Sequence, residues 1–265
     1  MLRCGQRHLC LAKKGDPLTR KTRHIVAYGG GGFSMEPDNF LLDDFALQLT
    51  RGKSPRVCFL PTASGDSAEY IANFYSAFRW PRAHASHLPL FVRTHEHPRD
   101  RLLDQDVIYV GGGNTANMLA IWRVHGIDEI LREAWRRGIV LVGISAGMLC
   151  WFECGVTDSF GPLVELQDGL GFLPGSACPH YNHESRRPAY HEIVKGGLLS
   201  GYAADDGAAL HFVDLGLKEC VSSSPKAHAY RVELRAGRVR ESKLPTRYLG
   251  RTRDGDQARA PARPR

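Results

Sequence analysis

The sequence predicts an α/β fold in which a doubly wound, mainly parallel sheet carries helices on both faces. Short β-rich runs alternate with helical patterns, and glycine-rich loops join them. The run Ile139–Ile144 is apolar apart from one glycine, which predicts a strand buried on both faces. In such a sheet, functional residues lie at the carboxyl ends of the strands.

The first half of the chain supplies these elements in alternation. His24–Phe33 is β-rich up to its four glycines, which predicts the first strand and its loop. Apolar residues at helical spacing predict helices in the segments that follow, and β-rich apolar runs predict strands. In chain order these are a helix at Asp38–Leu49, a strand at Arg56–Ser64, a helix at Glu69–Phe78, a strand at Val107–Thr115, and helices at Ala116–Trp122 and Ile127–Arg137.

The patterns weaken in the second half. The apolar segment Met148–Phe152 predicts a helix that ends at Glu153. Later segments predict a helix at Glu192–Leu199 and strands at Ala208–Val213 and Ala229–Leu234. Since no repeat or clear linker interrupts the chain, we predict one α/β domain at residues 24–248. A basic extension precedes it at residues 1–23, and a basic disordered tail follows at residues 249–265.

Composition and charge exclude several classes of protein. The 265 residues are 43% hydrophobic and 24% charged, as in a globular protein. The net charge of +7 belongs to the two ends: residues 1–23 carry seven basic residues against one Asp, and residues 249–265 carry five against two. We therefore predict no nucleic-acid partner. The longest uncharged apolar run has 14 residues, whereas a bilayer needs about 20, so we also predict no membrane partner.

The cysteines predict a reducing compartment. There are seven, an odd number, and none forms a C-x-x-C pair. Cys58 and Cys150 lie in apolar runs, where a reduced cysteine acts as a small hydrophobic residue. The N-terminus lacks the apolar stretch of a secretory signal. We therefore expect a cytoplasmic protein.

The sharpest motif is the G-x-S-x-G pentapeptide Gly143–Gly147, which has Ser145 at its centre. It directly follows a predicted strand and precedes an apolar segment, which is the setting of a nucleophile elbow. Such a turn holds the serine in a strained conformation, while small neighbours expose its hydroxyl. We predict Ser145 as a nucleophile; the alternative is a glycine-rich turn with an incidental serine.

A serine nucleophile needs a base and an acid that orients it. His180 follows a strand-like segment and is predicted to emerge at the same sheet edge as Ser145, with His183 and His191 as second choices. Asp158 is our choice for the acid. The carboxylates that remain as alternatives are Glu153, Glu165 and Glu184.

Glycine loops supply candidate backbone donors. Gly112, in the loop before Asn114, and Ala146 are predicted to donate their N–H groups to an oxyanion. The alternative for this loop is a phosphate cradle or a simple turn. The loop Gly29–Gly32 fails the G-x-G-x-x-G fingerprint, and the sequence has no P-loop motif, so a nucleotide site is not favoured.

A metal site is a further alternative. His180, His183 and Glu184 lie within five residues and could coordinate zinc, although their spacing is not that of H-E-x-x-H. Because the serine mechanism already uses His180, we predict neither a metal nor another cofactor.

Together, a GGGN loop, a G-x-S-A-G elbow about 30 residues later and a Pro-His dipeptide about 35 residues after that resemble the dipeptidase E family of serine peptidases, which includes cyanophycinase-like enzymes. The resemblance covers Ile25–Val213. It implies a sheet related to class I glutamine amidotransferases and cleavage of dipeptides with N-terminal aspartate. It also implies Ser145 as nucleophile, His180 as base, and Gly112 with Ala146 as the oxyanion hole.

The resemblance also suggests substrate contacts. Arg186 and Arg187 fall where aspartyl dipeptidases carry an arginine for the substrate carboxylate, and Asn114 is a further candidate. We thus predict a serine exopeptidase for short peptides, with small peptides as partners and a homodimer left open. The alternatives are an α/β-hydrolase-type esterase and a non-catalytic binding module on the same fold.

Overall fold

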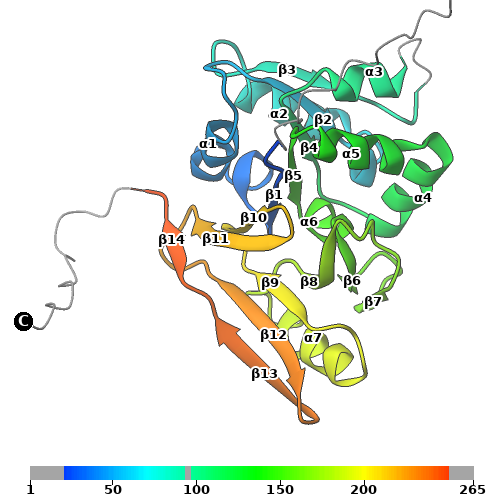
Figure 1. Ribbon diagram of the computed structural model, residues 1–265, viewed down its shortest axis with the longest axis vertical. Helices are drawn as coiled ribbons and strands as arrows, with labels where there is room; N and C mark the ends of the chain where they lie inside the picture. The colour runs from blue at the N-terminus through cyan, green and yellow to red at the C-terminus, as the bar shows by residue number, and fades with distance from the viewer. Residues whose placement is uncertain (1–20, 93–96, 251–265) are drawn as a thin grey trace, which may run out of the picture.

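The core of the structure is a sheet of eight strands (Figure 1). Its parallel strands alternate with helices along the chain, as the sequence predicts. The computed structural model describes residues 21–92 and 97–250. The strand order is β14-β11-β10-β1-β5-β4-β2-β3, and the strands from β1 to β3 in this order run parallel. In that order the strands span Thr246–Tyr248, Gly216–Ser222, Ala208–Val213, His24–Tyr28, Val140–Ile144, Val107–Val110, Arg56–Leu60 and His84–His87.

Helices cover both faces of this sheet. Successive residues of β1 point to opposite faces: Val26 and Tyr28 pack with α1 and α2, whereas Ile25 and Ala27 pack with the other helices. The helices of the first face are α1 (Leu41–Gln48) and α2 (Ala68–Ala77), and those of the second are α3 (Pro98–Leu103), α4 (Thr115–His125), α5 (Ile127–Arg136) and α6 (Ala146–Cys150). This confirms the predicted doubly wound α/β fold.

Local sequence signals set the ends of these helices. The Ser67 hydroxyl accepts a hydrogen bond from the backbone N–H of Tyr70 at the start of α2, and the Asn114 side chain caps α4 in the same way. Gly126 ends α4 with a φ of 65°, a left-handed conformation that favours glycine. Single 3₁₀ turns at Gly32–Ser34 and Thr62–Ser64 follow β1 and β2.

A second sheet of six strands lies below the first in Figure 1 and packs against helix α7 (Arg186–Lys195). Its order is β13-β12-β9-β8-β6-β7, and β6, β8 and β9 are parallel. In that order the strands span Arg238–Lys243, Ala229–Arg235, Gly201–Ala204, Leu173–Cys178, Phe152–Thr157 and Val164–Leu166. The predicted strands at 208–213 and 229–234 are thus confirmed, but they belong to different sheets.

Two predicted helices have different bounds in the structure. The helix after Ser145 ends at Cys150, and β6 begins at Phe152. Gly155 in β6 approaches β8 closely: a Cβ there would lie 2.3 Å from the carbonyl oxygen of Ala177, so the glycine permits this pairing. Helix α7 begins and ends earlier than predicted. It ends at Lys195 because two glycines, at 196 and 197, follow its last residue.

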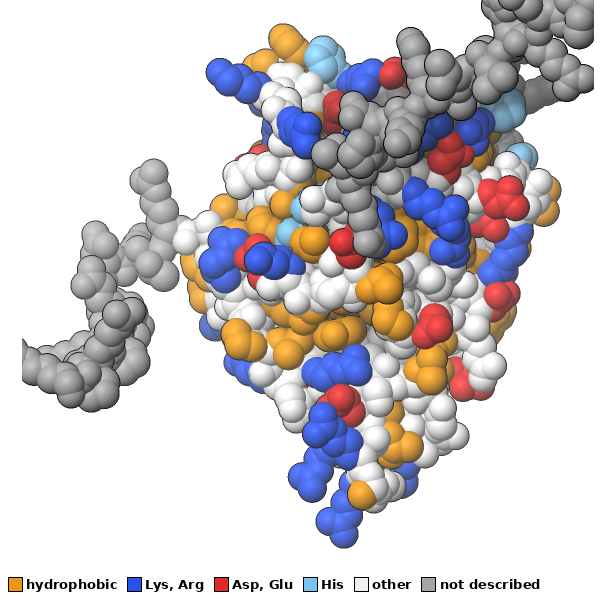
Figure 2. Space-filling view, viewed as in Figure 1, with side chains coloured by type: hydrophobic (Ala, Val, Ile, Leu, Met, Phe, Trp, Pro, Cys, Tyr) orange, Lys and Arg blue, Asp and Glu red, His pale blue; other side chains and the backbone are white. Residues whose placement is uncertain are grey.

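Basic side chains gather at the lower end of the molecule, over the β12–β13 hairpin (Figure 2). Arg235, Arg238, Arg240 and Lys243 are exposed there. The basic segments at 1–23 and 249–265 lie almost entirely outside the described residues. An extension at one end and a disordered tail at the other therefore remain predictions. Over the part of the chain that the structure describes, no helix has the length and apolar composition needed to cross a membrane.

Candidate active site

The first sheet brings three segments together at one edge. Ile144 of β5, Tyr28 of β1 and Ala209 of β10 lie side by side in register. Parallel strands β1 and β5 end at this row, and the antiparallel strand β10 begins beside it. The residues just beyond the row therefore meet: Ser145 after β5, the loop Gly29–Gly32 after β1, and the turn that precedes β10.

Ser145 occupies a sharp turn between β5 and α6. Its φ of 55° and ψ of −105° are rare for a residue with a side chain. Glycines on either side allow the turn, since a Cβ at Gly143 would lie 2.1 Å from the carbonyl oxygen of Gly147, and one at Gly147 would lie 2.5 Å from that of Val110. The predicted strand-turn-helix geometry at Ser145 is confirmed.

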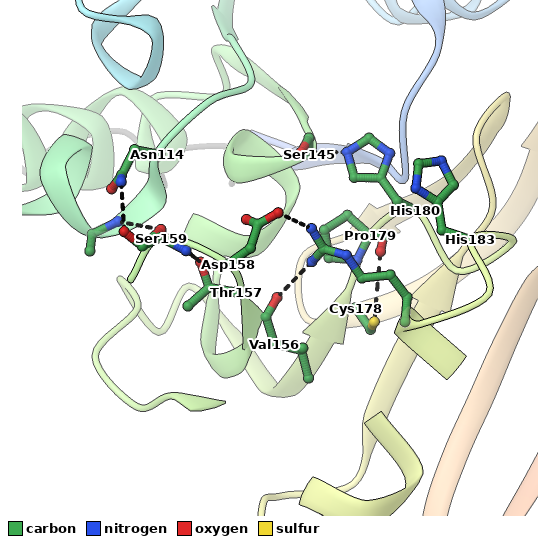
Figure 3. A network of polar contacts seen from close by, with 12 residues as sticks. Asn114, Ser145, Val156, Thr157, Asp158, Ser159, Cys178, Pro179, His180 and His183 are labelled. Carbon is green, nitrogen blue, oxygen red and sulfur yellow. Dashed lines mark hydrogen bonds and ion pairs between the residues drawn. The ribbon is translucent and has the colours of Figure 1, made fainter. Parts of the chain in front are cut away.

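His180 reaches this serine from the second sheet. It follows β8 with a φ of 53°, and its backbone N–H donates to the carbonyl oxygen of Gly29 at 3.1 Å. Nε2 of its ring lies 2.7 Å from Oγ of Ser145 (Figure 3). The two residues expected to pair are therefore within hydrogen-bonding distance.

Asp206, which the sequence analysis did not select, contacts the other ring nitrogen. Oδ1 of Asp206 lies 2.5 Å from Nδ1 of His180. Asp206 lies in the turn between β9 and β10, and its backbone forms a bridge with Gly30 beyond β1. Gly30 leaves room for the contact: a Cβ there would lie 1.9 Å from Oδ1 of Asp206 and 3.0 Å from Nδ1 of His180.

The choice of Asp158 as the partner of His180 is corrected by this geometry. Asp158 follows β6, and its carboxylate instead accepts a hydrogen bond from Arg186 at 2.7 Å. Figure 3 shows the Asp158 carboxylate well apart from the His180 ring. The reason is the strand order β9-β8-β6, in which the loop after β9 and the end of β6 flank β8 on opposite sides. Of the alternatives, Glu153 accepts from the backbone of Gly175, Glu165 accepts from Gln167, and Glu184 is exposed.

Asp206 holds its charge between two imidazoles. Burial alone would raise the pKa of its carboxyl group, but hydrogen bonds and charge interactions with His180 and His183 outweigh burial and bring the pKa below its ordinary value. Nε2 of His183 lies 2.8 Å from Oδ2, and the backbone N–H of Asp206 donates to Asn182 at 2.8 Å. An ionised carboxylate here can fix the orientation of His180 and stabilise its protonated form.

The predicted oxyanion donors lie next to Ser145. A Cβ at Gly112 would lie 3.4 Å from Cβ of Ser145, and Ala146 is the first residue of α6. The N–H of Gly112 donates to the hydroxyl of Tyr70 at 3.1 Å. Burial raises the pKa of this phenol, so it stays neutral. An oxyanion that binds Gly112 must therefore replace the Tyr70 hydroxyl.

The predicted substrate-binding side chains all have partners within the chain. Asn114 donates from its side chain to the carbonyl oxygen of Ser159 at 2.9 Å. Arg186 is 8% exposed and bonds Asp158, as described above. Nε of Arg187 lies 3.6 Å from Oε2 of Glu241, and the guanidinium group stacks over the ring of Tyr181. A substrate carboxylate would have to compete with these internal carboxylates for either arginine.

Asp206 carried one sequence signal that was not used. It lies in the run Asp205-Asp206-Gly207, and Asp-Gly marks tight turns. That signal locates a turn before β10 but does not show which strand lies beside β10. Only the antiparallel pairing of β1 with β10 brings this turn to the end of β1, and from there to His180.

The fold and the site define the class of protein: a doubly wound α/β protein with a serine at a strained strand-to-helix turn, in contact with a histidine. The chain belongs to peptidase family S51, whose model matches residues 25–220. It is therefore a peptidase, and the predicted resemblance to dipeptidase E-like peptidases is confirmed.

Related proteins agree with this assignment. The chain is 55% identical over 230 residues to YgaJ, an uncharacterized peptidase of Bacillus subtilis (strain 168); the match covers 86% of this chain and all of that protein. It is 32% identical over 143 residues to peptidase E of Streptomyces coelicolor, which covers 52% of this chain and 57% of that protein.

Solved structures share the fold. A peptidase from an acI-B1 Actinobacterium has a TM-score of 0.64 at 17% identity, covering 86% of this chain and 96% of that one. A protein described as peptidase E from Listeria monocytogenes EGD-e has a TM-score of 0.55 at 20% identity, covering 75% of this chain and 96% of that one. At these identities the likeness concerns the fold alone.

Proposed function

We propose that this peptidase is a serine peptidase that hydrolyses short peptides through an acyl-enzyme at Ser145. One observation carries the proposal: an unbroken line of hydrogen-bonding distances runs from Oγ of Ser145 through both ring nitrogens of His180 to the carboxylate of Asp206. This arrangement is what a serine hydroxyl needs to become a nucleophile.

The residues divide the reaction between them. His180 takes the Ser145 proton at Nε2 as Oγ attacks the peptide carbonyl, and Asp206 stabilises the imidazolium through Nδ1. The N–H groups of Gly112 and Ala146 stabilise the oxyanion. Collapse of this intermediate breaks the C–N bond, and His180 gives its proton to the leaving amine. Water then attacks the acyl-enzyme by the same route and frees Ser145.

The substrate class is a short peptide, by analogy with the peptidase E relatives. A preference for N-terminal aspartate, which the resemblance implied, would need a cationic side chain that is free to bind the substrate. Arg186 and Arg187 already contact Asp158 and Glu241. We therefore propose a short-peptide exopeptidase with no assigned preference for N-terminal aspartate.

The cellular setting proposed is the cytoplasm. All five cysteines in the described part of the chain are free and buried, which fits a reducing compartment. Cys4 and Cys10 lie outside the described residues. The proposed mechanism draws every proton transfer from side chains of this chain and requires no external cofactor.

A small dipeptide panel tests the proposal. Asp-Leu, Glu-Leu, Met-Leu and Leu-Leu are incubated with the wild type and with the Ser145→Ala variant, and free leucine is measured. We expect hydrolysis that the variant loses, together with labelling of the wild type alone by a fluorophosphonate. Cleavage of Asp-Leu alone would support a preference for substrates with N-terminal aspartate.

Two other results would point to the competing functions. Hydrolysis of small esters without any peptide cleavage would favour an esterase. A folded wild type that neither reacts with the fluorophosphonate nor cleaves any substrate would favour a non-catalytic binding module.

A further inference from the structure

Three side chains of metal-binding type meet behind the Ser145–His180 pair. Nδ1 of His180 and Nε2 of His183 each lie against one oxygen of Asp206, and one ligand atom from each residue lies within 4.8 Å of the others. The two rings are 5.2 Å apart, and Figure 3 shows His183 on the side of His180 that faces away from Ser145. Two imidazole nitrogens and a carboxylate oxygen form a donor set that suits Zn²⁺ and similar ions.

The cluster is reachable from solvent, and its exposed member can move to close around an ion. The side chain of His183 is 53% exposed, whereas those of His180 and Asp206 are 16% and 20% exposed. Tetrahedral zinc with ligands at about 2.0–2.1 Å holds neighbouring ligand atoms about 3.3 Å apart. The two nitrogen–oxygen distances of 2.5 and 2.8 Å, which end on different oxygens of Asp206, must lengthen by less than about 1 Å. The ligand atoms lie within 4.8 Å of one another, so the widest separation must shorten by at most about 1.5 Å, a movement available to the exposed His183.

The charge of the cluster also suits a cation. The Asp206 side chain supplies an anionic oxygen beside the two imidazole nitrogens. Glu184, the third ligand suggested by sequence spacing, is exposed and is not a member of the cluster. The fold supplies Asp206 in its place, from 23 residues beyond His183.

We propose that His180, His183 and Asp206 form an inhibitory binding site for a divalent transition-metal ion such as Zn²⁺. The inhibitory part of this inference rests on the proposed function, in which Nε2 of His180 accepts the Ser145 proton. The site lies on the Nδ1 side of His180, so the metal and the peptide approach the imidazole from opposite sides.

Inhibition follows from the tautomer that the metal imposes. In the working enzyme His180 carries its proton on Nδ1, bonded to Asp206, and leaves the Nε2 lone pair free for the serine proton. A metal at Nδ1 requires the lone pair there, so the neutral ring carries its single proton on Nε2. Nε2–H then donates to Oγ of Ser145 and cannot accept its proton. The metal also takes the Asp206 carboxylate away from the imidazole.

Metal binding is tested first, without any need for activity. The Ser145→Ala variant keeps all three ligands, and zinc is titrated into it by calorimetry at neutral pH. We expect one zinc per chain at this site. Adding His183→Gln, which keeps an N–H donor toward Asp206, weakens binding about 10- to 100-fold. Adding His125→Gln, at the exposed end of α4, leaves binding unchanged and serves as the matched control.

Inhibition is tested second, on enzymes with Ser145 intact. Zinc is expected to slow dipeptide hydrolysis reversibly, with activity restored by EDTA, and His183→Gln raises the half-inhibitory zinc concentration about 10- to 100-fold relative to its own uninhibited rate. Absence of zinc binding to Ser145→Ala, or binding and inhibition that do not respond to His183→Gln, would overturn the site.

The two proposals fail in different ways. Zinc that binds Ser145→Ala through His183, in a protein whose wild type hydrolyses no peptide, would keep the metal site and remove the proposed function. Peptide hydrolysis that depends on Ser145 but does not respond to zinc would keep the function and remove the inhibitory site.

Discussion

Nδ1 of His180 lies 2.5 Å from Oδ1 of Asp206, and each residue comes from a loop that follows a strand of the second sheet. The other ring nitrogen of His180 contacts Ser145, which directly follows a strand of the first sheet. The site is therefore assembled where two sheets meet, and the glycine loop after β1 lies at that junction, since Gly29 accepts from the backbone of His180.

The first prediction concerns the space that Gly30 provides. In Gly30→Ala the new methyl group would lie 1.9 Å from Oδ1 of Asp206, so the carboxylate must leave His180. We expect kcat to fall about 10²- to 10⁴-fold, toward the loss seen when a triad acid is removed. Gly52→Ala is the control, because nothing lies within 4 Å of its Cβ. Peptide hydrolysis by a folded Gly30→Ala enzyme at the wild-type rate would contradict the assignment of Asp206.

The second prediction concerns acid stability. Burial, aided by the nearby charge of His24, lowers the pKa of His211 to about 4. The unfolded chain takes up this proton near pH 6.5, so between pH 6.5 and 4 the unfolded state binds more protons and stability falls as pH falls. The loss is at most about 3.5 kcal/mol, from about 1.4 kcal/mol per pKa unit over this shift.

Urea unfolding at pH 7.5 and pH 5.0 measures this effect. We expect His211→Gln, which cannot titrate, to lose about 2 kcal/mol less than the wild type between the two pH values. The exposed His125 gives a control in His125→Gln. Equal losses in the wild type and in His211→Gln would show that His211 does not cause the acid sensitivity.

The third prediction has the opposite sign. Burial raises the pKa of Asp43 to about 7 despite the hydrogen bond from Tyr109, and within the described residues Oδ2 of Asp43 has no partner. The folded state keeps this proton up to about pH 7, whereas the unfolded state releases it near pH 4. Stability therefore falls as pH rises through this window.

Asp43→Asn removes the charge without changing the shape of the side chain. We expect the variant to be more stable than the wild type at pH 8, by a few kcal/mol at most, and close to it at pH 4. Asp44→Asn is the matched control, since Asp44 lies next to Asp43 but pairs with Arg82 at the surface. A variant that is less stable than the wild type at pH 8 would contradict a raised pKa for Asp43.

The sequence alone predicted the features that are determined by residues close together in the chain. The elbow at Ser145 follows from five consecutive residues, and the parallel strands follow from short apolar runs. His180 could be chosen because it ends a strand-like segment soon after the elbow. All three inferences use chemistry within a few residues of the feature itself.

Asp206, the carboxylate that contacts His180, could not be predicted from the sequence. Its position depends on pairing between strands that are far apart in the chain. Asp158 was chosen because it was expected to begin the loop after the helix that follows Ser145, whereas strand β6 lies between that helix and Asp158. Asp206 reaches His180 only because β10 pairs antiparallel with β1, a contact between residues about 180 positions apart. Sequence patterns fix strand existence far better than strand partners.

The most direct test of the account compares two carboxylates in the same assay, by measuring kcat for dipeptide hydrolysis in Asp206→Asn and Asp158→Asn. The account predicts a fall of about 10⁴-fold for Asp206→Asn, since an amide would favour the wrong tautomer of His180. Asp158→Asn is expected to change kcat less than about tenfold, because Asp158 contacts Arg186 and not the imidazole. Near-normal turnover in Asp206→Asn, or a larger loss in Asp158→Asn, would contradict the relay from Ser145 through His180 to Asp206.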